Sequence, residues 1–174
     1  MFLLKKLLAI ALVLCFASVV FSSSEVLYAT QENTLERVAE EIIRDSWGSL
    51  TNWSPPQQRI QRIRIIPQAN EIDVALDVRL GINDNLTAAM IRQGFIMDCR
   101  NSILLLFENP QLEEITEIRF FGSFEPSGSG APVARLVISR NLASQIPWER
   151  ISLDDAIELI RRGGGNVWLI NALR

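Results

Sequence analysis

A regular alternation of side chains over residues 71–80 is the feature that most limits how this chain can fold. Every second residue is a large aliphatic one: Ile72, Val74, Leu76, Val78 and Leu80. Successive side chains of a strand point to opposite faces of its sheet, so this pattern predicts a strand with one buried and one solvated face. The chain is therefore expected to contain a sheet that other elements cover on one face.

The segment just before this strand supplies the other half of a predicted hairpin. Residues 59–66 carry arginines out of phase with isoleucines, and the short connection 67–70 joins them to the strand. Such a hairpin places arginines across from acids on its solvated face. Cross-strand ion pairing explains these residues better than a metal site or a glycosidase-like pair of carboxylates. The candidate binding surface consists of Arg62, Arg64, Glu71, Asp73 and Asp77.

The remaining patterns complete an α-β-β-α-β-β-α order. The segment after the first hairpin is predicted to be a long helix with Asp84 or Asn85 as its N-cap, and Ser152 is expected to cap the last helix. We predict a two-layer α+β sandwich with a mostly antiparallel four-stranded sheet and helices on one face. The long helix forms a crossover, which allows the second and third strands to run parallel. Helices are expected over 34–47, 86–107 and 152–162, strands over 59–66, 71–80, 115–124 and 133–139, and a short helical turn over 141–146. The tail 166–174 is left between a short strand and a docked terminal turn.

The N-terminal segment predicts export. Lys5 and Lys6 precede an apolar run over residues 7–21, and Ser22 follows it, which is the arrangement of a signal peptide. We expect residues 1–24 to be a signal peptide, cleaved at a position between 22 and 29, and residues 30–174 to form a single α+β domain. The alternative is an uncleaved anchor formed by residues 7–21, although this run is shorter than the roughly 20 residues that span a bilayer. The expected location is extracellular or in the cell envelope, with the membrane involved only if this segment is retained.

The absence of His, and of Lys after position 6, limits the reactions that the predicted exported part can catalyse. The chain has no His, and its two lysines both precede the apolar run, so a histidine base, a lysine nucleophile and the usual zinc ligands are excluded. We therefore assign no catalytic residue, cofactor or metal ligand. Cys99 lies on a helical ladder of apolar residues and is expected to be buried. From Thr30 onward the net charge is about −4, which argues against nucleic-acid binding.

The middle of the chain resembles small exported bacterial proteins without an assigned function. The similar segments lie between Gly81 and Trp148 and are mostly helix starts and core positions. The resemblance implies export and an α+β fold, and it supplies no active site. It also implies a signal that often ends in a lipid-accepting cysteine, which Cys15, in the middle of the apolar run, does not match. The segments are 83–87 (Asn-Asp-Asn-Leu-Thr), 94–98 (Gly-Phe-Ile-Met-Asp), 115–118, 138–140 and 146–148.

Together these features predict a non-catalytic binding or accessory module of the cell envelope or the medium. Its partner is expected to be a protein or an envelope component. The alternative is a carboxylate-based hydrolase acting on envelope polysaccharide, which needs two acids about 5–10 Å apart across a cleft. A third hypothesis is an accessory subunit whose partner covers an apolar patch around Trp148 or Trp168.

Overall fold

The computed structural model describes residues 34–68, 74–83, 87–124 and 131–170. The chain divides into two compact units, Met1–Leu35 and Glu36–Arg174. The described residues of the first unit are Thr34 and Leu35, both helical. All the strands of the sheet described below belong to the second unit.

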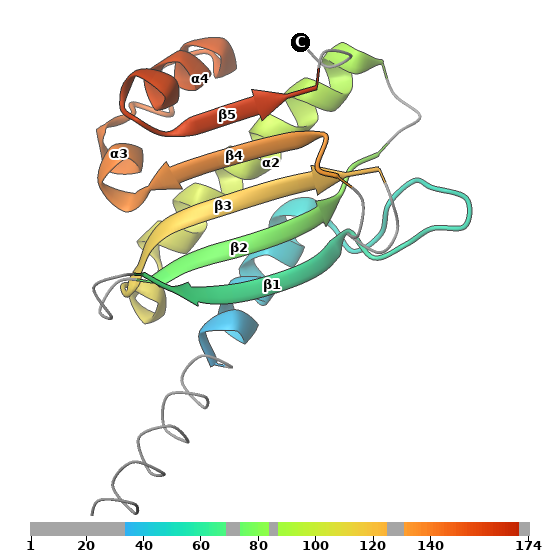
Figure 1. The fold of residues 1–174 in the computed structure, drawn as a ribbon, viewed down its shortest axis with the longest axis horizontal. Coiled ribbons are helices and arrows are strands. Elements are labelled where there is room, and N and C mark those ends of the chain that lie inside the picture. Colours follow the sequence, from blue (N-terminus) through green and yellow to red (C-terminus); the bar gives the residue numbers. More distant parts are fainter. Residues whose placement is uncertain (1–33, 69–73, 84–86, 125–130, 171–174) are drawn as a thin grey trace, which may run out of the picture. The chain divides into compact units, whose positions relative to one another are not determined.

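A five-stranded mixed sheet forms the centre of the second unit (Figure 1). The strands lie side by side in chain order, so each pairs with its neighbour in sequence. β2 and β3 run parallel, and every other neighbouring pair is antiparallel. The strands are β1 (Ile60–Pro67), β2 (Val74–Gly81), β3 (Ile115–Ser123), β4 (Ala134–Ser139) and β5 (Asn166–Leu169).

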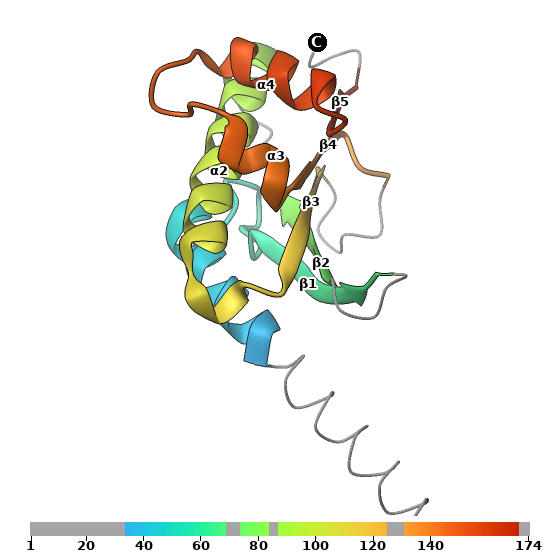
Figure 2. The ribbon, with the colours of Figure 1, turned by 90° about the vertical axis from the view of Figure 1, so that its left-hand side faces the viewer.

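Helices cover one face of this sheet and leave the other open, as Figure 2 shows edge-on. The parallel pairing of β2 and β3 requires a connection that crosses the sheet, and α2 provides it. A single crossover keeps the long helix on one side, and the later helices pack beside it. The helical elements are helix 34–47, α2 (Ala88–Glu108), the short 3₁₀ turn η1 (Pro110–Leu112), α3 (Arg140–Gln145) and α4 (Leu153–Arg162).

Trp47 ties helix 34–47 into the core between the two layers. Its side chain is 3% exposed, stacks on Phe120 of β3 with ring centroids 6.2 Å apart, and meets the edge of Phe95 of α2 at 5.9 Å. The indole Nε1 donates a hydrogen bond of 2.9 Å to Oγ of Ser102, which is fully buried. Two buried polar atoms thus satisfy each other, and the ring joins both layers.

Arg140 donates hydrogen bonds to backbone carbonyl groups between the end of α2 and the start of β3. Its guanidinium donates to the carbonyl oxygens of Phe107, Leu112 and Ile115 at 2.5, 2.6 and 3.0 Å. It also stacks over the Phe107 ring, with Cζ 4.6 Å from the centroid. The carbonyls at a helix C-terminus lack intrahelical partners, so this contact replaces hydrogen bonds that the chain reversal removes.

The helix caps agree with the sequence at α4 and differ at α2. Ser152 caps α4, and its Oγ accepts a hydrogen bond of 3.1 Å from the Asp155 N–H, as predicted. The prediction of Asp84 or Asn85 as the cap of α2 is wrong, because the N-cap is Thr87, whose Oγ1 accepts from Met90 N. Hydroxyl and carboxylate side chains cap equally well, so the sequence alone does not rank neighbouring candidates.

The α+β class and the helices on one face are confirmed, and most strand pairs are antiparallel, but the predicted four strands and the exact element order are wrong because the sheet is mixed and has five strands. The tail contributes a fifth strand, β5, which pairs with β4. Four residues are too few to show a periodicity, so this strand depends on the partner that the fold brings beside it. The crossover prediction is confirmed by the parallel β2–β3 pair. Cys99 is buried as expected, and burial raises the pKa of its thiol, which makes it inert.

Two glycine substitutions with opposite expected signs test this packing. An added Cβ at Gly122 would lie 2.2 Å from Cδ1 of buried Ile82, so Gly122→Ala should destabilise the fold by about 1–3 kcal/mol. At Gly94, inside α2, a Cβ meets nothing within 4 Å, so Gly94→Ala should stabilise by about 0.5–1 kcal/mol. Urea unfolding of the purified chain measures both. A destabilised Gly94→Ala or a neutral Gly122→Ala would contradict the packing.

Candidate functional site

The candidate site is the open face of the sheet, which no described helix covers (Figure 2). Burial alternates along the strands, with aliphatic and aromatic side chains beneath the helices and polar ones on the open face. Every charged residue of the five strands points to the open face. These residues are the arginines Arg62, Arg64, Arg79, Arg119 and Arg135 and the acids Asp77 and Glu117.

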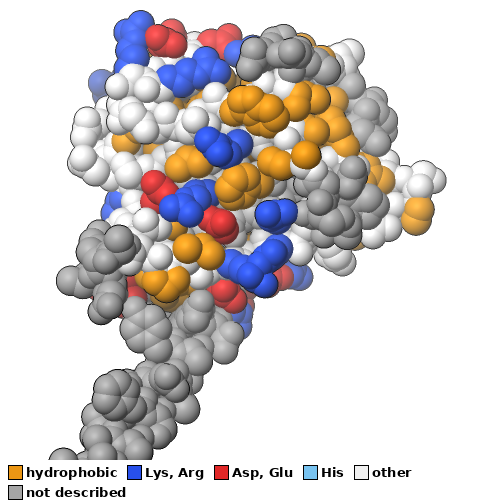
Figure 3. Space-filling view, in the orientation of Figure 1, with side chains coloured by type: hydrophobic (Ala, Val, Ile, Leu, Met, Phe, Trp, Pro, Cys, Tyr) orange, Lys and Arg blue, Asp and Glu red, His pale blue; other side chains and the backbone are white. Residues whose placement is uncertain are grey.

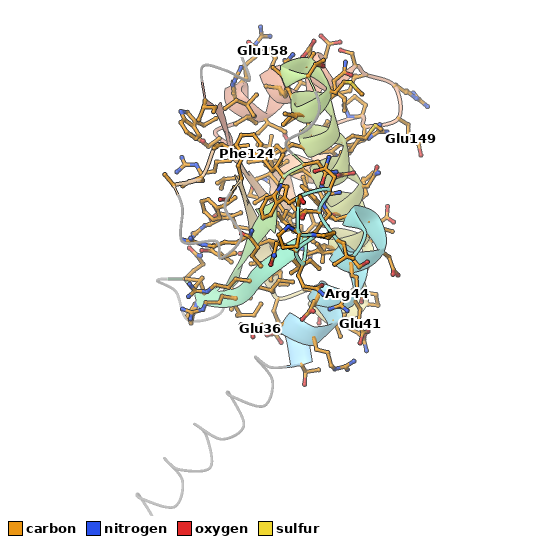
Figure 4. All side chains as sticks on the ribbon, turned by 90° about the vertical axis from the view of Figure 1, so that its right-hand side faces the viewer. Glu36, Glu41, Arg44, Phe124, Glu149 and Glu158 are labelled. Carbon is orange, nitrogen blue, oxygen red and sulfur yellow. The ribbon has the colours of Figure 1, made fainter. Side chains whose placement is uncertain are left out.

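The strand residues therefore make a basic surface on a chain whose overall net charge is −3. Figure 3 looks onto this face and shows basic and hydrophobic side chains interleaved across it. Exposed acids such as Glu41 and Glu149 project from the helical side, as Figure 4 shows. Charge is thus unevenly divided between the two sides, and the excess of arginine lies on the sheet.

One row of side chains crosses the whole sheet at right angles to the strands. The strand register places its members directly opposite one another in successive pairs. Neighbours on one face of adjacent strands are in contact range, so the row forms a continuous strip. In order from β1 to β5 it consists of Arg62, Arg79, Phe121, Arg135 and Trp168.

Contacts within this strip orient its cations beside its aromatic rings. The Arg79 guanidinium lies over the Phe121 ring, with Cζ 6.0 Å from the centroid. Arg135 donates through Nε to Oδ1 of Asn166 in β5 at 3.1 Å. Trp168 is 38% exposed. The strip thus presents arginine donors and an accessible aromatic ring in one line.

The neighbouring row contains a compact charge cluster that is satisfied mainly within itself. Arg119 donates through Nε to Glu117 at 2.5 Å, and its Nη1 lies 3.6 Å from Oδ1 of Asp77. Burial raises the pKa of Asp77 more than the nearby arginines lower it. Arg64 lies directly opposite Asp77 in the register of β1 and β2. The cluster holds its own charges together and offers less to a ligand than the strip does.

At each edge of the sheet, a charged side chain from the helical layer binds one backbone group. Glu36 accepts a hydrogen bond of 2.9 Å from the backbone N–H of Ile65 in β1. At the opposite edge, Arg161 donates through Nε and Nη2 to the carbonyl oxygen of Val167 in β5, at 3.3 and 3.1 Å. An edge whose backbone groups meet charged side chains is a poor template for another strand. A partner of this sheet is therefore expected on its face.

The structure brings together three of the five residues proposed from the sequence. Arg62, Arg64 and Asp77 lie on the open face, and Glu71 and Asp73 lie outside the described residues. Cross-strand pairing is altered, because the ion pair of Asp77 involves Arg119 of β3. Sequence reasoning missed Arg119, Arg135 and Phe121, and it named Trp168 only as a marker of an apolar patch. The period-two pattern of β3 and β4 could have indicated the first three, whereas Trp168 depends on the unassigned β5.

A second cluster lies inside the unit and joins α2 to the segment before β1. Arg59 donates to the carbonyl oxygen of Trp47 at 2.7 Å, lies over its ring, and has Nη2 3.5 Å from Oδ2 of Asp98 in α2. Both charged side chains are largely buried. Burial raises the pKa of Asp98 to about 6, and the attraction of Arg59 offsets only part of that effect. The cluster therefore ties α2 to the segment before β1.

Two grooves lie away from the open centre of the sheet. One, of about 440 Å³, runs along the β5 edge, and Trp168 and Arg161 form part of its wall. The other, of about 390 Å³, lies between helix 34–47 and the end of α2, and Asp45 and Glu108 both line it. Asp77 and Asp98, whose pKa values are raised, line neither groove.

Within the described residues, no group of three or more metal-ligating side chains comes together. No helix in that part of the chain has the length and apolar character needed to cross a membrane. The apolar run at 7–21 falls outside it. Of the two tryptophans proposed to mark an apolar patch, Trp148 is 6% exposed and donates to the Ala143 carbonyl, whereas Trp168 is exposed.

Comparison with protein-family models, with curated proteins and with solved structures finds no match for this chain. The case for a function therefore rests on the residues and geometry of the open face.

The buried acid makes a testable contribution to stability. Because the pKa of Asp98 is raised to about 6 from an ordinary value of 3.8, the folded state binds this proton more tightly than the unfolded state. Its contribution to the free energy of unfolding is therefore largest at low pH and is lost as the pH rises from about 4 to above 6. The expected loss is about 1–3 kcal/mol.

Asp98→Asn should lack this dependence, while the other carboxylates titrate equally in both proteins. Urea unfolding at pH 4, 5, 6 and 7 gives the difference in unfolding free energy between wild type and variant. As the pH rises, the unfolding free energy of the wild type should fall relative to that of the variant. A difference that moves the opposite way would show that the attraction of Arg59 outweighs burial.

Proposed function

We propose that this protein is an exported, non-catalytic binding or accessory module that holds a partner on the open face of its sheet. The observation that carries this proposal is the excess of arginine over acid among the strand residues of the uncovered face, beside the exposed Trp168, on an otherwise acidic chain. A solvated sheet face needs neither feature for folding, since small polar residues serve it equally well. Arg and Trp are also the residues most enriched where binding energy is concentrated.

The N-terminal segment supports the exported part of the proposal. Lys5 and Lys6, the apolar run 7–21 and the serines after it form the sequence of a signal peptide or an uncleaved anchor. Either outcome delivers the α+β unit outside the cytoplasm. The partner we propose is a protein or another component of the cell envelope.

The residue types present and the placement of the acids favour binding over catalysis. The chain contains no His. Its acids with raised pKa, Asp77 and Asp98, lie on different layers, each beside an arginine. A pair of carboxylates that acts on one bond must converge on one cleft, and these two do not.

The binding proposal is tested by removing charge from the open face. In Arg62→Gln/Arg64→Gln, two exposed cations of β1 are lost, while the matched control Arg37→Gln/Arg150→Gln removes two exposed cations from the helical side. Cells expressing each chain are fractionated and washed, and the protein retained on the envelope is measured. The β1 variant should be retained several-fold less than wild type and control, because attraction to the partner is reduced. Equal retention of all three, or a chain recovered from the cytoplasm, would contradict the proposal.

One observation favours the alternative of a carboxylate-based hydrolase for envelope polysaccharide. Asp45 and Glu108 line the same groove of about 390 Å³, so two acids do share a concave surface there. A hydrolase of this kind uses one as a general acid and the other as a base or nucleophile.

This alternative makes a separate prediction. The purified chain incubated with cell-wall polysaccharide would release reducing ends, and Asp45→Asn or Glu108→Gln would each lower that rate by at least about a hundredfold. Asp155→Asn is a matched control, because Asp155 is an exposed acid of α4 away from this groove. We expect no release above the level of a heat-denatured sample.

A further inference from the structure

The solvent-exposed side of α2 lacks the charges that the outer face of a surface helix carries. All 21 residues of α2 are described, and among those that are exposed only Glu108 is charged. A surface helix of a soluble domain typically turns charged and polar side chains to water and apolar ones to the core. Three large apolar side chains of α2 instead face solvent, since Met90, Met97 and Leu105 are 52%, 50% and 48% exposed. The other exposed residues are Ala88, Ala89, Gln93 and Asn101.

The exposed residues of α2 form one stripe that is nearly symmetric about its centre. Steps of three and four residues keep side chains on one side of a helix, and the stripe runs through Met90, Gln93, Met97, Asn101 and Leu105. Gln93 and Asn101 lie at equal distances before and after Met97, and so, within one residue, do Met90 and Leu105. An antiparallel copy related by a twofold axis at Met97 would set methionine against methionine and amide against amide. The stripe is therefore complementary to itself, as an isologous interface requires.

A groove lies where a methionine of this second copy would arrive. The groove of about 390 Å³ between helix 34–47 and the end of α2 has apolar walls formed by Ile42, Leu105 and Pro110. A twofold axis at Met97 brings Met90 of the second copy beside Leu105, at the wall of this groove. The unbranched methionine side chain adapts to the shape of such a recess. Each copy would supply one methionine and one groove, so the same axis fills both grooves.

The charge at the end of α2 fits an antiparallel neighbour. Glu108 stands in the last turn of α2, which contains no basic residue, and the first turn contains no acid. An acid at the C-terminus of its own helix opposes the helix dipole, whereas the N-terminus of an antiparallel helix places partial positive charge beside it. Asp45 lines the same groove as Glu108 and adds negative charge at that point. Antiparallel pairing is therefore favoured over parallel pairing.

Other occupants match this stripe less well. A lipid surface would also cover exposed acids on the helical side, such as Glu41 and Glu149 (Figure 4), and removing those carboxylates from water is costly. Pairing of two copies through their open sheet faces is opposed by like charge, because each face would present the same excess of arginine. A second copy meeting this one through α2 avoids both costs.

We propose that two copies of this chain associate through the exposed stripe of α2, with the two helices antiparallel about a twofold axis at Met97. The stripe lies on the helical side, so the dimer leaves both open sheet faces uncovered (Figure 2). One assembly then presents two copies of the candidate site. The inference goes beyond the proposed function and does not depend on it.

Cysteine cross-linking tests the position of the axis. The full chain is expressed with Cys15→Ser in every protein, so that buried Cys99 is the remaining native thiol. Met97→Cys should form an intermolecular disulfide under mild oxidation, because its two copies face each other across the axis. Met90→Cys is the matched control and should form several-fold less, since seven residues of helix on each side of the axis hold its two copies about 20 Å apart.

Charge substitutions at the centre of the stripe test whether two copies meet there. Met97→Glu and Met97→Lys should each weaken self-association at least about tenfold in sedimentation equilibrium of the purified full chain, because like charges meet at the axis. A mixture of the two should associate again, because opposite charges then meet. Leu159→Glu, which places an acid at an exposed leucine of α4, is the matched control and should associate like wild type. Thermal unfolding midpoints check that each variant is folded.

Each contrary outcome overturns the inference in a recognisable way. Equal cross-linking of Met90→Cys and Met97→Cys would show that the helices are not antiparallel about this axis. Self-association that Arg62→Gln/Arg64→Gln abolishes and Met97→Glu does not would place the contact on the sheet. Binding to phosphatidylglycerol vesicles that Met97→Glu abolishes, without any Met97→Cys cross-link, would assign the stripe to lipid. A monomeric wild type without that cross-link would also overturn it, whereas the proposed function is judged separately by retention on the envelope.

Discussion

The parallel pairing of β2 and β3 is the constraint on which the rest of the structure depends. Parallel neighbours cannot be joined by a tight turn, so the chain must cross the sheet, and α2 does so. α2 then packs against β3 and β4. With only one such crossover, the described helices all lie on one side, and they leave the other face of the sheet uncovered (Figure 2).

A group of aromatic and charged side chains around Trp47 connects the helical layer to the sheet. Trp47 stacks on the sheet, touches α2 and bonds to Ser102, while Arg59 bonds to the Trp47 backbone and faces Asp98. Burying an ion pair costs desolvation, which is why the pKa of Asp98 is raised even beside an arginine. The pair orients Trp47 and the segment before β1 more than it stabilises them.

The fold and the open face differ in how much of each the sequence predicted. The alternation at 71–80 led to a one-sided sheet, and the signals around Ser152 led to α4, because local hydrogen bonding and periodicity produce both. The cap of α2 was misplaced, because several neighbouring residues can serve. For β5 the sequence left open a short strand or a terminal turn, since its four residues form a strand only where β4 supplies a partner.

The candidate surface shows the same division. Arg62, Arg64 and Asp77 could be placed on a solvated face from their alternation alone, whereas their relation to Arg135 and Trp168 could not be known from sequence. Those residues lie far apart along the chain, and only the register of four strand pairs sets them in one line.

By itself the sequence determined which face of each long strand is solvated, that histidine chemistry is absent, and that two lysines and an apolar run precede the α+β unit. Only the tertiary structure decided that residues on the solvated faces of the five strands line up in one basic strip, with a charged side chain bound at each edge of the sheet. The physical reason is the distance along the chain over which each kind of interaction acts. Periodicity and composition act within a few residues, whereas register and layering arise from backbone pairing and packing between segments that are distant in sequence.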